Sequence, residues 1–413
     1  MGQHLDEPSN ASRSTPRPLR VVRIVADYAV GGKASYGLQP VYYNLSRTQA
    51  AMGHEVHVIA RRRKNEPSEE LNEGVSIHRV GSPFNLYALA KVRELTNDER
   101  DGVRSVVHTH STAGLFLAAT KRGIRAPVVS HIHGTTYSAA TPSTLSFGDI
   151  TAGYSPMKVT LAYIREQALW SAADRLAAVS TSVKSDLMSR YGMSEQKIRL
   201  VYNGVDAQLF HPIADPEFPE KDLVRGKKVV LYVGHFGLRK GVPFLIRAMK
   251  TVRQQVPDSM LVCIGGVPSW LPKGDYWSYL RGLVAKNDLE KQVLLLDRVP
   301  NERLPNYYSM SDVFVLPSYY EAFPKVLIEA MACEKPAISS RMGGTQDSIQ
   351  DGVNGYLVNY ADPEALAAAI VPLLQDDALA RRMGAIGRQR VLREFTWDAV
   401  ASRFDSVYGE VLK

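Results

Sequence analysis

Short apolar runs alternate with longer helical stretches along the chain, beginning at Leu19. The apolar runs, rich in Val and Ile, predict strands in the first half at 21–26, 55–60, 75–80, 103–110, 128–133 and 176–180. Helical periodicity predicts helices between them, for example at 41–52, 115–122 and 158–172. Buried runs separated by helices are typical of a parallel sheet that is covered on both faces.

The same alternation continues in the second half. Strands are predicted at 229–234, 260–265, 293–296, 313–316 and 337–340, with helices beginning near residues 241, 276, 304 and 324. The tail after residue 362 is predicted to be helical throughout. Its last part carries one apolar stripe, formed by Trp397, Phe404, Tyr408 and Leu412.

These patterns predict an α/β protein with two doubly wound, Rossmann-like domains that face each other across a cleft. We expect a disordered tail at 1–18, an N-terminal domain at 19–210, a linker at 211–226 and a C-terminal domain at 227–396. The linker includes the polar, proline-rich segment 215–220. In such sheets the ligand crevice lies at the carboxyl ends of the strands.

Composition fits two globular domains. Of the 413 residues, 45% are hydrophobic and 22% are charged, which excludes a disordered or fibrous chain. Lys and Arg number 50 against 42 Asp and Glu, so the net charge is +8. This surplus permits nucleic acid, an anionic membrane surface or phosphorylated ligands, and selects none of them. The densest basic run, 61–64, is interpreted as a solvated loop, with a lipid-phosphate or acceptor contact as the alternative.

The sequence also bears on the compartment. Residues 1–18 lack the apolar core of a signal peptide, and no stretch approaches the roughly 20 apolar residues of a membrane span. The two cysteines, Cys263 and Cys333, lie in apolar surroundings and are predicted to be core residues, which suits a reducing cytosol. We therefore expect a cytoplasmic protein and leave association with the inner membrane surface open.

Two common nucleotide motifs are missing from the sequence. No G-x-G-x-x-G follows the first strand and no G-x-x-x-x-G-K-[ST] occurs, which disfavours a dinucleotide oxidoreductase and a P-loop NTPase. The first strand is followed instead by Gly31 and Gly32. Such a pair forms a tight turn or lets backbone N–H groups approach a phosphate or sugar.

The most informative stretch is 316–336. Glu321 lies in a loop after a buried strand, and Glu329 follows eight positions later inside an apolar helix. A carboxylate in that setting is costly to desolvate, so Glu329 requires ligand hydroxyls or protein donors as partners. A carboxylate that caps a neighbouring loop is the alternative.

Glu321 and Glu329 match the two glutamates of the E-x-x-x-x-x-x-x-E motif of retaining, GT-B-fold glycosyltransferases of family 4. The surrounding run resembles that family over its whole length. Further matches follow in the family's order, and the resemblance covers Leu19 to the C-terminus. These matches are N-G-V-D at 203–206, R-K-G at 239–241, and the glycine pairs at 265–266 and 343–344.

The resemblance implies a metal-independent, retaining hexosyltransferase of carbohydrate biosynthesis. The donor would be a nucleotide-diphosphate sugar, most simply a UDP- or GDP-sugar, bound as substrate with no cofactor. Lys240 would hold the donor diphosphate, Glu329 the ribose and Glu321 the hydroxyls of the transferred sugar. His133 would lie against the donor sugar and the acceptor. The resemblance also assigns these residues to the donor site: Gly31, Gly32, Arg239, Phe323, Pro324, Lys325 and Val326.

The resemblance further implies that the N-terminal domain binds the acceptor and is completed by the C-terminal helix at 397–413. Three positions depart from the family's pattern. His235 replaces an arginine after the donor-loop glycine, and Arg239 is the candidate to take over its diphosphate contact. Pro324 and Lys325 stand where the family usually has the Gly-x of Glu-x-Phe-Gly-x, and Asp347 replaces a glutamate. These departures leave the donor's identity open.

Four histidines occur as pairs at two strand ends: His108, His110, His131 and His133. Because alternate residues of a strand point to one side, these imidazoles could bind zinc. No carboxylate motif accompanies them, and the resemblance explains His133 otherwise. We therefore predict no metal site.

Two alternatives to the transferase are a non-catalytic nucleotide-sugar-binding partner subunit and a GT-B nucleotide-sugar epimerase. A scaffold has no need of a buried carboxylate, so the glutamate pair favours the transferase. A nucleic-acid partner is not predicted, because the chain has only one basic tetrad. The acceptor stays open between a small-molecule glycoside, a polysaccharide intermediate and a lipid. Candidate acceptor contacts are Tyr36, Arg61, Tyr137 and Tyr154.

Overall fold

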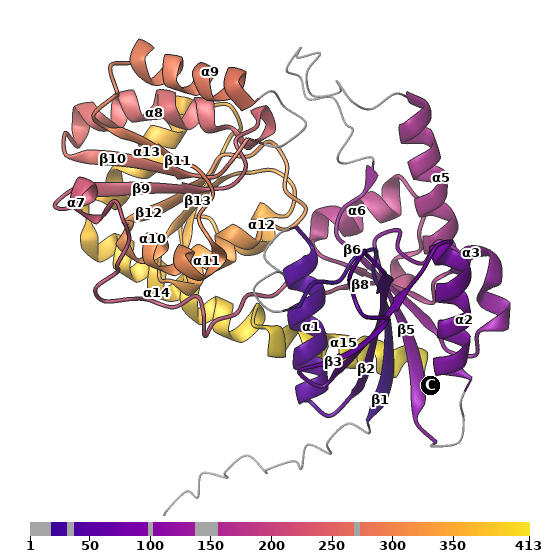
Figure 1. Cartoon of the computed structure of the whole chain (residues 1–413). Coiled ribbons are helices and arrows are strands. Elements are labelled where there is room, and N and C mark those ends of the chain that lie inside the picture. Colours follow the sequence, from indigo (N-terminus) through magenta and orange to yellow (C-terminus); the bar gives the residue numbers. More distant parts are fainter. Residues whose placement is uncertain (1–17, 31–36, 98–101, 137–155, 268–272) are drawn as a thin grey trace, which may run out of the picture.

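The computed structural model describes residues 18–30, 37–97, 102–136, 156–267 and 273–413, which form two α/β domains side by side (Figure 1). The first sheet has the strand order β3-β4-β2-β1-β5-β6-β7-β8. Its strands are β1 (Leu19–Ile24), β2 (Glu55–Arg61), β3 (Glu69–Asn72), β4 (Val75–Val80), β5 (Arg104–His110), β6 (Val128–Ile132), β7 (Arg175–Ala178) and β8 (Ile198–Leu200). The two-domain α/β prediction is confirmed.

The edges of the first sheet differ from the sequence prediction. The sheet is parallel except for β3, which pairs antiparallel with β4. Glu73 and Gly74 join these two strands, and both have a positive φ, 47° and 78°. A two-residue hairpin turn of this kind can only connect antiparallel strands. The wholly parallel sheet was therefore wrong at this edge, where the polar strand β3 gives no hydrophobic signal.

Helices cover both faces of the first sheet. One face carries α1 (Gln39–Ala51) and α15 (Trp397–Val411), and the other carries α2 (Phe84–Thr96), α3 (Leu117–Thr120) and α5 (Pro156–Ala172) (Figure 1). The helix α6 (Thr181–Ser189) follows β7. Ala88 and Val92 of α2 and Leu169 and Trp170 of α5 are fully buried in the core that these helices form with the sheet.

The second sheet has six parallel strands in the order β11-β10-β9-β12-β13-β14. They are β9 (Lys228–Val233), β10 (Ser259–Ile264), β11 (Val293–Leu296), β12 (Val313–Leu316), β13 (Ala337–Ser340) and β14 (Gly355–Val358). The order reverses between β9 and β12. In doubly wound sheets this reversal opens a crevice at the strands' carboxyl ends.

Helices also cover both faces of the second sheet (Figure 1). One face carries α8 (Val242–Gln255), α9 (Lys273–Lys286) and α13 (Pro363–Gln375), and the other carries α10 (Leu304–Met310), α11 (Lys325–Ala332) and α14 (Asp377–Glu394). The tail after residue 362, predicted to be helical throughout, forms three helices, α13, α14 and α15. Asp376 and Thr396 interrupt it, because each side chain accepts a backbone N–H and so caps the next helix.

The chain crosses between the domains twice, and the two crossings lie against each other. The backbone N–H of Val205 donates to the carbonyl of Phe395 at 2.8 Å. A Cβ on Gly204 would come within 2.6 Å of the Trp397 indole, so this close approach requires glycine. Beyond the crossing, α15 buries Trp397, Phe404 and Tyr408 against the first domain, as the apolar stripe predicts.

Some sequence predictions fall outside the described residues. These are residues 1–17 of the tail predicted to be disordered at 1–18, the glycines Gly31 and Gly32, and the acceptor candidates Tyr36, Tyr137 and Tyr154. Both cysteines are buried and unpaired, as predicted. Among the described residues, no helix combines the length and the apolar character needed to cross a membrane.

Candidate functional site

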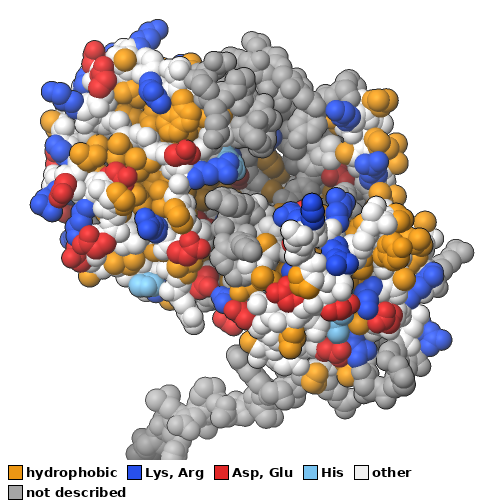
Figure 2. Space-filling view, viewed as in Figure 1, with side chains coloured by type: hydrophobic (Ala, Val, Ile, Leu, Met, Phe, Trp, Pro, Cys, Tyr) orange, Lys and Arg blue, Asp and Glu red, His pale blue; other side chains and the backbone are white. Residues whose placement is uncertain are grey.

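A cavity of about 430 Å³ lies between the two domains. Its floor is formed where β9, β10 and β12 end, which is the reversal point of the second sheet. Its opposite wall comes from the first domain, from the start of α1 and from His133 and Asn203. Figure 2 shows the hollow between the domains, with basic side chains near its mouth.

Most of the predicted site residues meet at this cavity. Eight of them line it: His133, Lys240, Glu321, Phe323, Pro324, Lys325, Val326 and Glu329. Arg239 lies next to Lys240 but is not among the lining residues, and its carbonyl accepts the N–H of Tyr319 at 2.7 Å. Residues separated by up to about two hundred positions are thus brought to one crevice by the two sheets.

Lys240 ends a short 3₁₀ turn, η4 (Leu238–Lys240), and reaches the cavity just before α8. The next residue, Gly241, has φ +70°, and a Cβ there would lie 1.9 Å from the carbonyl oxygen of Pro317. Only glycine allows the turn to lie this close to the strand end β12. The Lys-Gly pair therefore holds the lysine at the carboxyl end of the sheet.

Lys240 and Glu321 form an ion pair across the cavity floor. The lysine Nζ donates to Glu321 Oε1 at 2.5 Å, and both side chains are partly buried. The backbone N–H of Gly344 donates to the Glu321 carbonyl at 2.7 Å, which fixes the glutamate's loop against the Gly343–Gly344 pair. The carboxylate of Glu321 thus balances the charge of Lys240.

Glu329 lies deeper, on α11, with an exposed fraction of 7%. Tyr308 donates its hydroxyl to Glu329 Oε2 at 3.0 Å. Burial raises the pKa of Glu329, while Lys325 and the Tyr308 hydroxyl oppose that rise. Burial lowers the pKa of Lys325, and Glu329 opposes it. The two side chains are four positions apart on one helix, so they face the cavity together.

The wall from the first domain presents His133, just beyond β6. His110 Nδ1 and His133 Nε2 are 2.9 Å apart, which places a hydrogen bond between the two imidazoles. Burial lowers the pKa of His133 to about 3, and the charge of Lys325 on the opposite domain adds to the effect. His133 is therefore neutral at physiological pH.

Sequence reasoning missed several residues of this site. Arg298 and Asn301, which follow β11, line the cavity, and Tyr308 holds Glu329 from α10. His235, at the position where the family has arginine, is exposed at the cavity, and burial with the charges of Arg298 and Lys240 lowers its pKa. Arg298 therefore supplies a cation beside His235. A local motif search gives no signal for such residues, because they reach the site only through the strand order.

A contact between the domains is built around Asp347, in α12 (Thr345–Ser348). Its carboxylate accepts the backbone N–H of Thr181 at 3.1 Å and the Thr181 hydroxyl at 2.9 Å. Tyr202 donates its hydroxyl to the same carboxylate at 3.3 Å. Because Thr181 begins α6 of the first domain, Asp347 caps that helix from the second domain.

Two family models match the chain, and together they cover most of it. Residues 36–209 match the model described as Glycosyltransferase Family 4, and residues 214–390 match Glycosyl transferases group 1. The chain belongs to the family 4 glycosyltransferases. The resemblance based on the two glutamates is thereby confirmed, and the chain is an enzyme of the glycosyltransferase class.

Curated relatives agree with the family. A D-inositol 3-phosphate glycosyltransferase of Xylanimonas cellulosilytica is 28% identical over 401 residues, 91% of this chain and 92% of that protein. Spore coat protein SA of Bacillus subtilis is 32% identical over 244 residues, 57% of this chain. That second match spans 64% of the relative's own length.

Solved structures share the fold of this family 4 enzyme. Sucrose-phosphate synthase from Thermosynechococcus elongatus has a TM-score of 0.74 and 26% identity, and the match covers 95% of this chain and 99% of that one. HepE of Anabaena, solved in complex with UDP and glucose, has a TM-score of 0.73 at 17% identity, covering 95% and 100%. Both bear out the GT-B architecture.

Proposed function

We propose that this glycosyltransferase is a retaining, metal-independent enzyme that transfers a hexosyl unit from a UDP- or GDP-sugar to an acceptor hydroxyl. The observation that carries the proposal is the cavity between the domains. It places the Lys240–Glu321 ion pair and the buried Glu329 opposite His133. Each of these groups suits a different part of a nucleotide-diphosphate sugar.

The diphosphate is assigned to the cationic part of the cavity. Lys240, Lys325 and Arg298 all line it. Lys325 is the first residue of α11, where the helix dipole disfavours a cation unless an anion lies nearby. A bound diphosphate would balance the charge of Lys325 and accept hydrogen bonds from N–H groups at the start of α11. Cations held in place in this way stabilise the charge that develops on the leaving phosphate.

The two glutamates are assigned to different parts of the donor. When the diphosphate binds Lys240, Glu321 is released from its ion pair. Its carboxylate can then accept hydrogen bonds from hydroxyls of the transferred sugar. Glu329, which Tyr308 already orients, accepts hydrogen bonds from the ribose hydroxyls. The leaving diphosphate itself helps to deprotonate the acceptor, so the chain needs no carboxylate nucleophile. The protein then contributes positioning and charge stabilisation.

The donor and acceptor classes come from the relatives' names. The UDP and glucose complex of HepE supports a UDP-hexose as the first donor to test. The inositol 3-phosphate named for the Xylanimonas relative supports including small anionic polyols among the acceptors. Simple glycosides, polysaccharide intermediates and lipid acceptors complete the set. Lipid acceptors would bring the enzyme to a membrane surface.

The deciding experiment measures nucleotide release from UDP-, GDP- and ADP-sugars with and without each acceptor. We expect release from one nucleotide class to depend on an acceptor, and NMR of the product to show the donor's anomeric configuration. An inverted product would overturn the retaining assignment. Binding of the donor with no transfer to any acceptor would favour the non-catalytic partner subunit.

Metal independence is tested in the same assay. We expect the rate to be unchanged within about twofold after dialysis against EDTA, because the cavity's cations can neutralise the diphosphate without a metal ion. Complete loss of activity with EDTA, restored by Mn²⁺ or Mg²⁺, would contradict this part of the proposal.

A further inference from the structure

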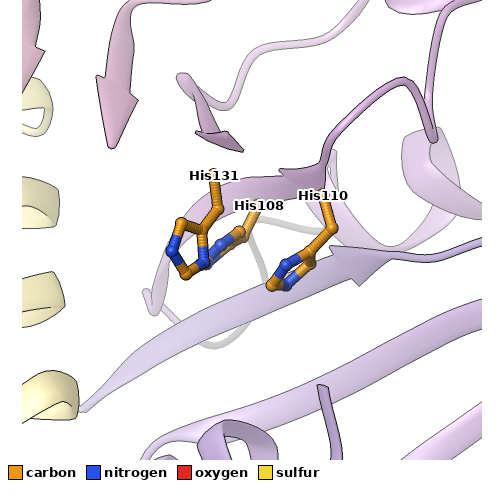
Figure 3. Close-up of side chains that lie close together, drawn as sticks. All are labelled: His108, His110 and His131. Carbon is orange, nitrogen blue, oxygen red and sulfur yellow. The ribbon is translucent and has the colours of Figure 1, made fainter. Parts of the chain in front are cut away.

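Three fully buried imidazoles, those of His108, His110 and His131, lie together behind the wall of the cavity that His133 forms. Figure 3 shows them projecting to the same side of β5 and β6. The exposed fraction of each is 1% or less. Their ring nitrogens come within 4.8 Å of one another, a spacing that brings metal ligation into question.

The arrangement of the rings disfavours a metal. The rings of His108 and His110 are stacked, with centroids 4.5 Å apart and planes 12° apart, so their in-plane lone pairs do not converge on one point. The surrounding charge is also unfavourable. Burial lowers the pKa of His108, His110 and His131, and the charge of Arg23, which is fully buried on β1, adds to that effect. A divalent cation would have to be desolvated beside that arginine.

The hydrogen bonds give the cluster a different role. Arg23 donates to Gln49 Oε1 at 2.6 Å, so the Gln49 amide nitrogen faces Tyr408 and donates to its hydroxyl oxygen at 3.4 Å. The Tyr408 proton is then directed to His108 Nδ1, 2.5 Å away. His108 is thus held by α15 and not by the site. Of the three imidazoles, His110 is the one with a hydrogen bond to His133.

We propose that His110 is a positioning residue for His133, fixing through their 2.9 Å hydrogen bond the orientation and the tautomer of the imidazole that faces donor and acceptor. The bond occupies His133 Nε2 and leaves Nδ1 as its remaining ring nitrogen. The two ring planes are only 8° apart and the ring centroids are 5.2 Å apart, so the rings lie edge to edge with the hydrogen bond close to both ring planes. Tyr42 packs on His110 from α1 with centroids at 4.5 Å, which limits rotation of His110.

The inference rests on the proposed function, with His133 against the donor sugar and the acceptor as the family resemblance implies, and it adds the residue that orients His133. Second hydrogen bonds to a functional imidazole decide which nitrogen carries the proton. Burial lowers the pKa of both imidazoles, so the hydrogen bond joins two neutral rings. Loss of His110 would let the His133 ring rotate, and misplacement of a contact group by about 1 Å costs on the order of 10²-fold in rate.

The test compares His110→Phe with His110→Asn in the full chain. Phe keeps the packing but has no polar atom, whereas the Asn side-chain amide nitrogen occupies the place of His Nδ1. We expect His110→Phe to lower kcat by on the order of 10²-fold with less than a threefold change in donor KM. We expect His110→Asn to regain at least a tenth of the kcat that His110→Phe loses. The matched control is His108→Phe, an equally buried change on the same strand whose native hydrogen bond goes to Tyr408.

A double-mutant cycle with His133→Ala separates the inference from the proposed function. If His110 acts through His133, adding His110→Phe to His133→Ala causes no further loss of kcat. Unchanged kcat in His133→Ala would refute the role of His133 itself. Normal kcat in His110→Phe, with His133→Ala impaired, would overturn the inference alone. Equal losses in His110→Phe, His110→Asn and His108→Phe, or one tightly bound metal ion per chain, would also overturn it.

Discussion

The two domains have related folds but differently built cores. Polar and charged side chains are buried on the strands of the first sheet: Arg20, Arg23, His57, His78, Arg79, His108, His110 and His131. The strands of the second sheet bury mainly aliphatic and aromatic residues, with serines as the polar exceptions in their buried positions. In the second domain the candidate site residues lie on loops beyond the strand ends and on α11. In the first domain polar side chains extend into the core.

This difference has a physical meaning. An apolar core gains stability from burial alone and can support a donor site on its loops without taking part in it. A polar core must satisfy each buried group, and a satisfied network fixes one arrangement of side chains. The first domain therefore has less apolar burial, and its buried polar groups hold the side chains around His133 in one arrangement. The second domain carries Lys240 and Glu321 on turns and loops beyond its strand ends, and Glu329 on α11.

The largest effect is expected at the second domain's strand ends. Lys240→Ala should lower kcat/KM by on the order of 10²–10³-fold, as for other groups that stabilise charge in a transition state. The melting temperature should change by no more than a degree or two, because Lys240 is partly exposed and not part of the core. Lys250→Ala, an exposed lysine on α8, is the matched control. Near-normal kcat/KM in Lys240→Ala would remove it from the site.

The second effect concerns acid stability and separates the two cores directly. Burial lowers the pKa of His108, His110 and His131 well below 6.5. Below pH 6.5 these histidines take up protons in the unfolded chain but not in the folded one, so the free energy of unfolding falls as the pH falls. The loss reaches about 1.4 kcal/mol per pH unit for each histidine that stays neutral.

The measurement is thermal unfolding at pH 7, 6 and 5, with fluorescence and calorimetry distinguishing the domains. We expect the first domain to unfold at lower temperature as the pH falls and the second to change less. His131→Leu should make the pH dependence shallower, whereas His211→Gln, on the exposed linker, should not. Equal acid sensitivity of both domains would contradict the comparison.

A third, smaller effect distinguishes the two glutamates of the second domain. Glu329→Gln should weaken binding of both the free nucleoside diphosphate and the intact donor by about tenfold, the size of one charge-assisted hydrogen bond. Glu321→Gln should leave nucleoside diphosphate affinity unchanged or raise it, because it frees Lys240, and should depress turnover. Glu364→Gln, an exposed site on α13, serves as control in calorimetric titration. Equal loss of nucleotide binding in both variants would refute the separate roles.

The smallest effect is expected where the domains meet. Asp347→Ala removes the acceptor for the Thr181 N–H and hydroxyl, at a cost of about 1–2 kcal/mol of unfolding free energy for a lost helix cap. Asp347→Asn keeps one acceptor oxygen and should recover part of that loss. Chemical denaturation measures both variants. An unchanged denaturation midpoint in Asp347→Ala would show that the contact between Asp347 and Thr181 contributes nothing to the docking of the domains.

Many individual elements and part of the site could be predicted from the sequence, and the two glutamates show why. Glu321 and Glu329 are eight residues apart at a strand-to-helix junction, so local pattern alone places both near one strand end. The strands β4, β11, β12 and β13 likewise follow from short apolar runs. The strands β3, β8 and β14 escaped prediction. Strand β3 is mostly polar, β8 has only three residues and β14 begins with glycine, so none presents a run of apolar residues as long as those of β11 and β12.

The sequence by itself determined the fold class, the domain order and the motif residues, because hydrophobic periodicity and turn chemistry act over a few neighbouring positions. Only the tertiary structure decided the partners of those residues. His110 reaches His133 across 23 positions, Tyr308 reaches Glu329 across 21 and Lys240 reaches Glu321 across 81. Whether these residues meet depends on which strands lie side by side and on how the domains dock. That order results from burying the whole core at once, and no local segment encodes it.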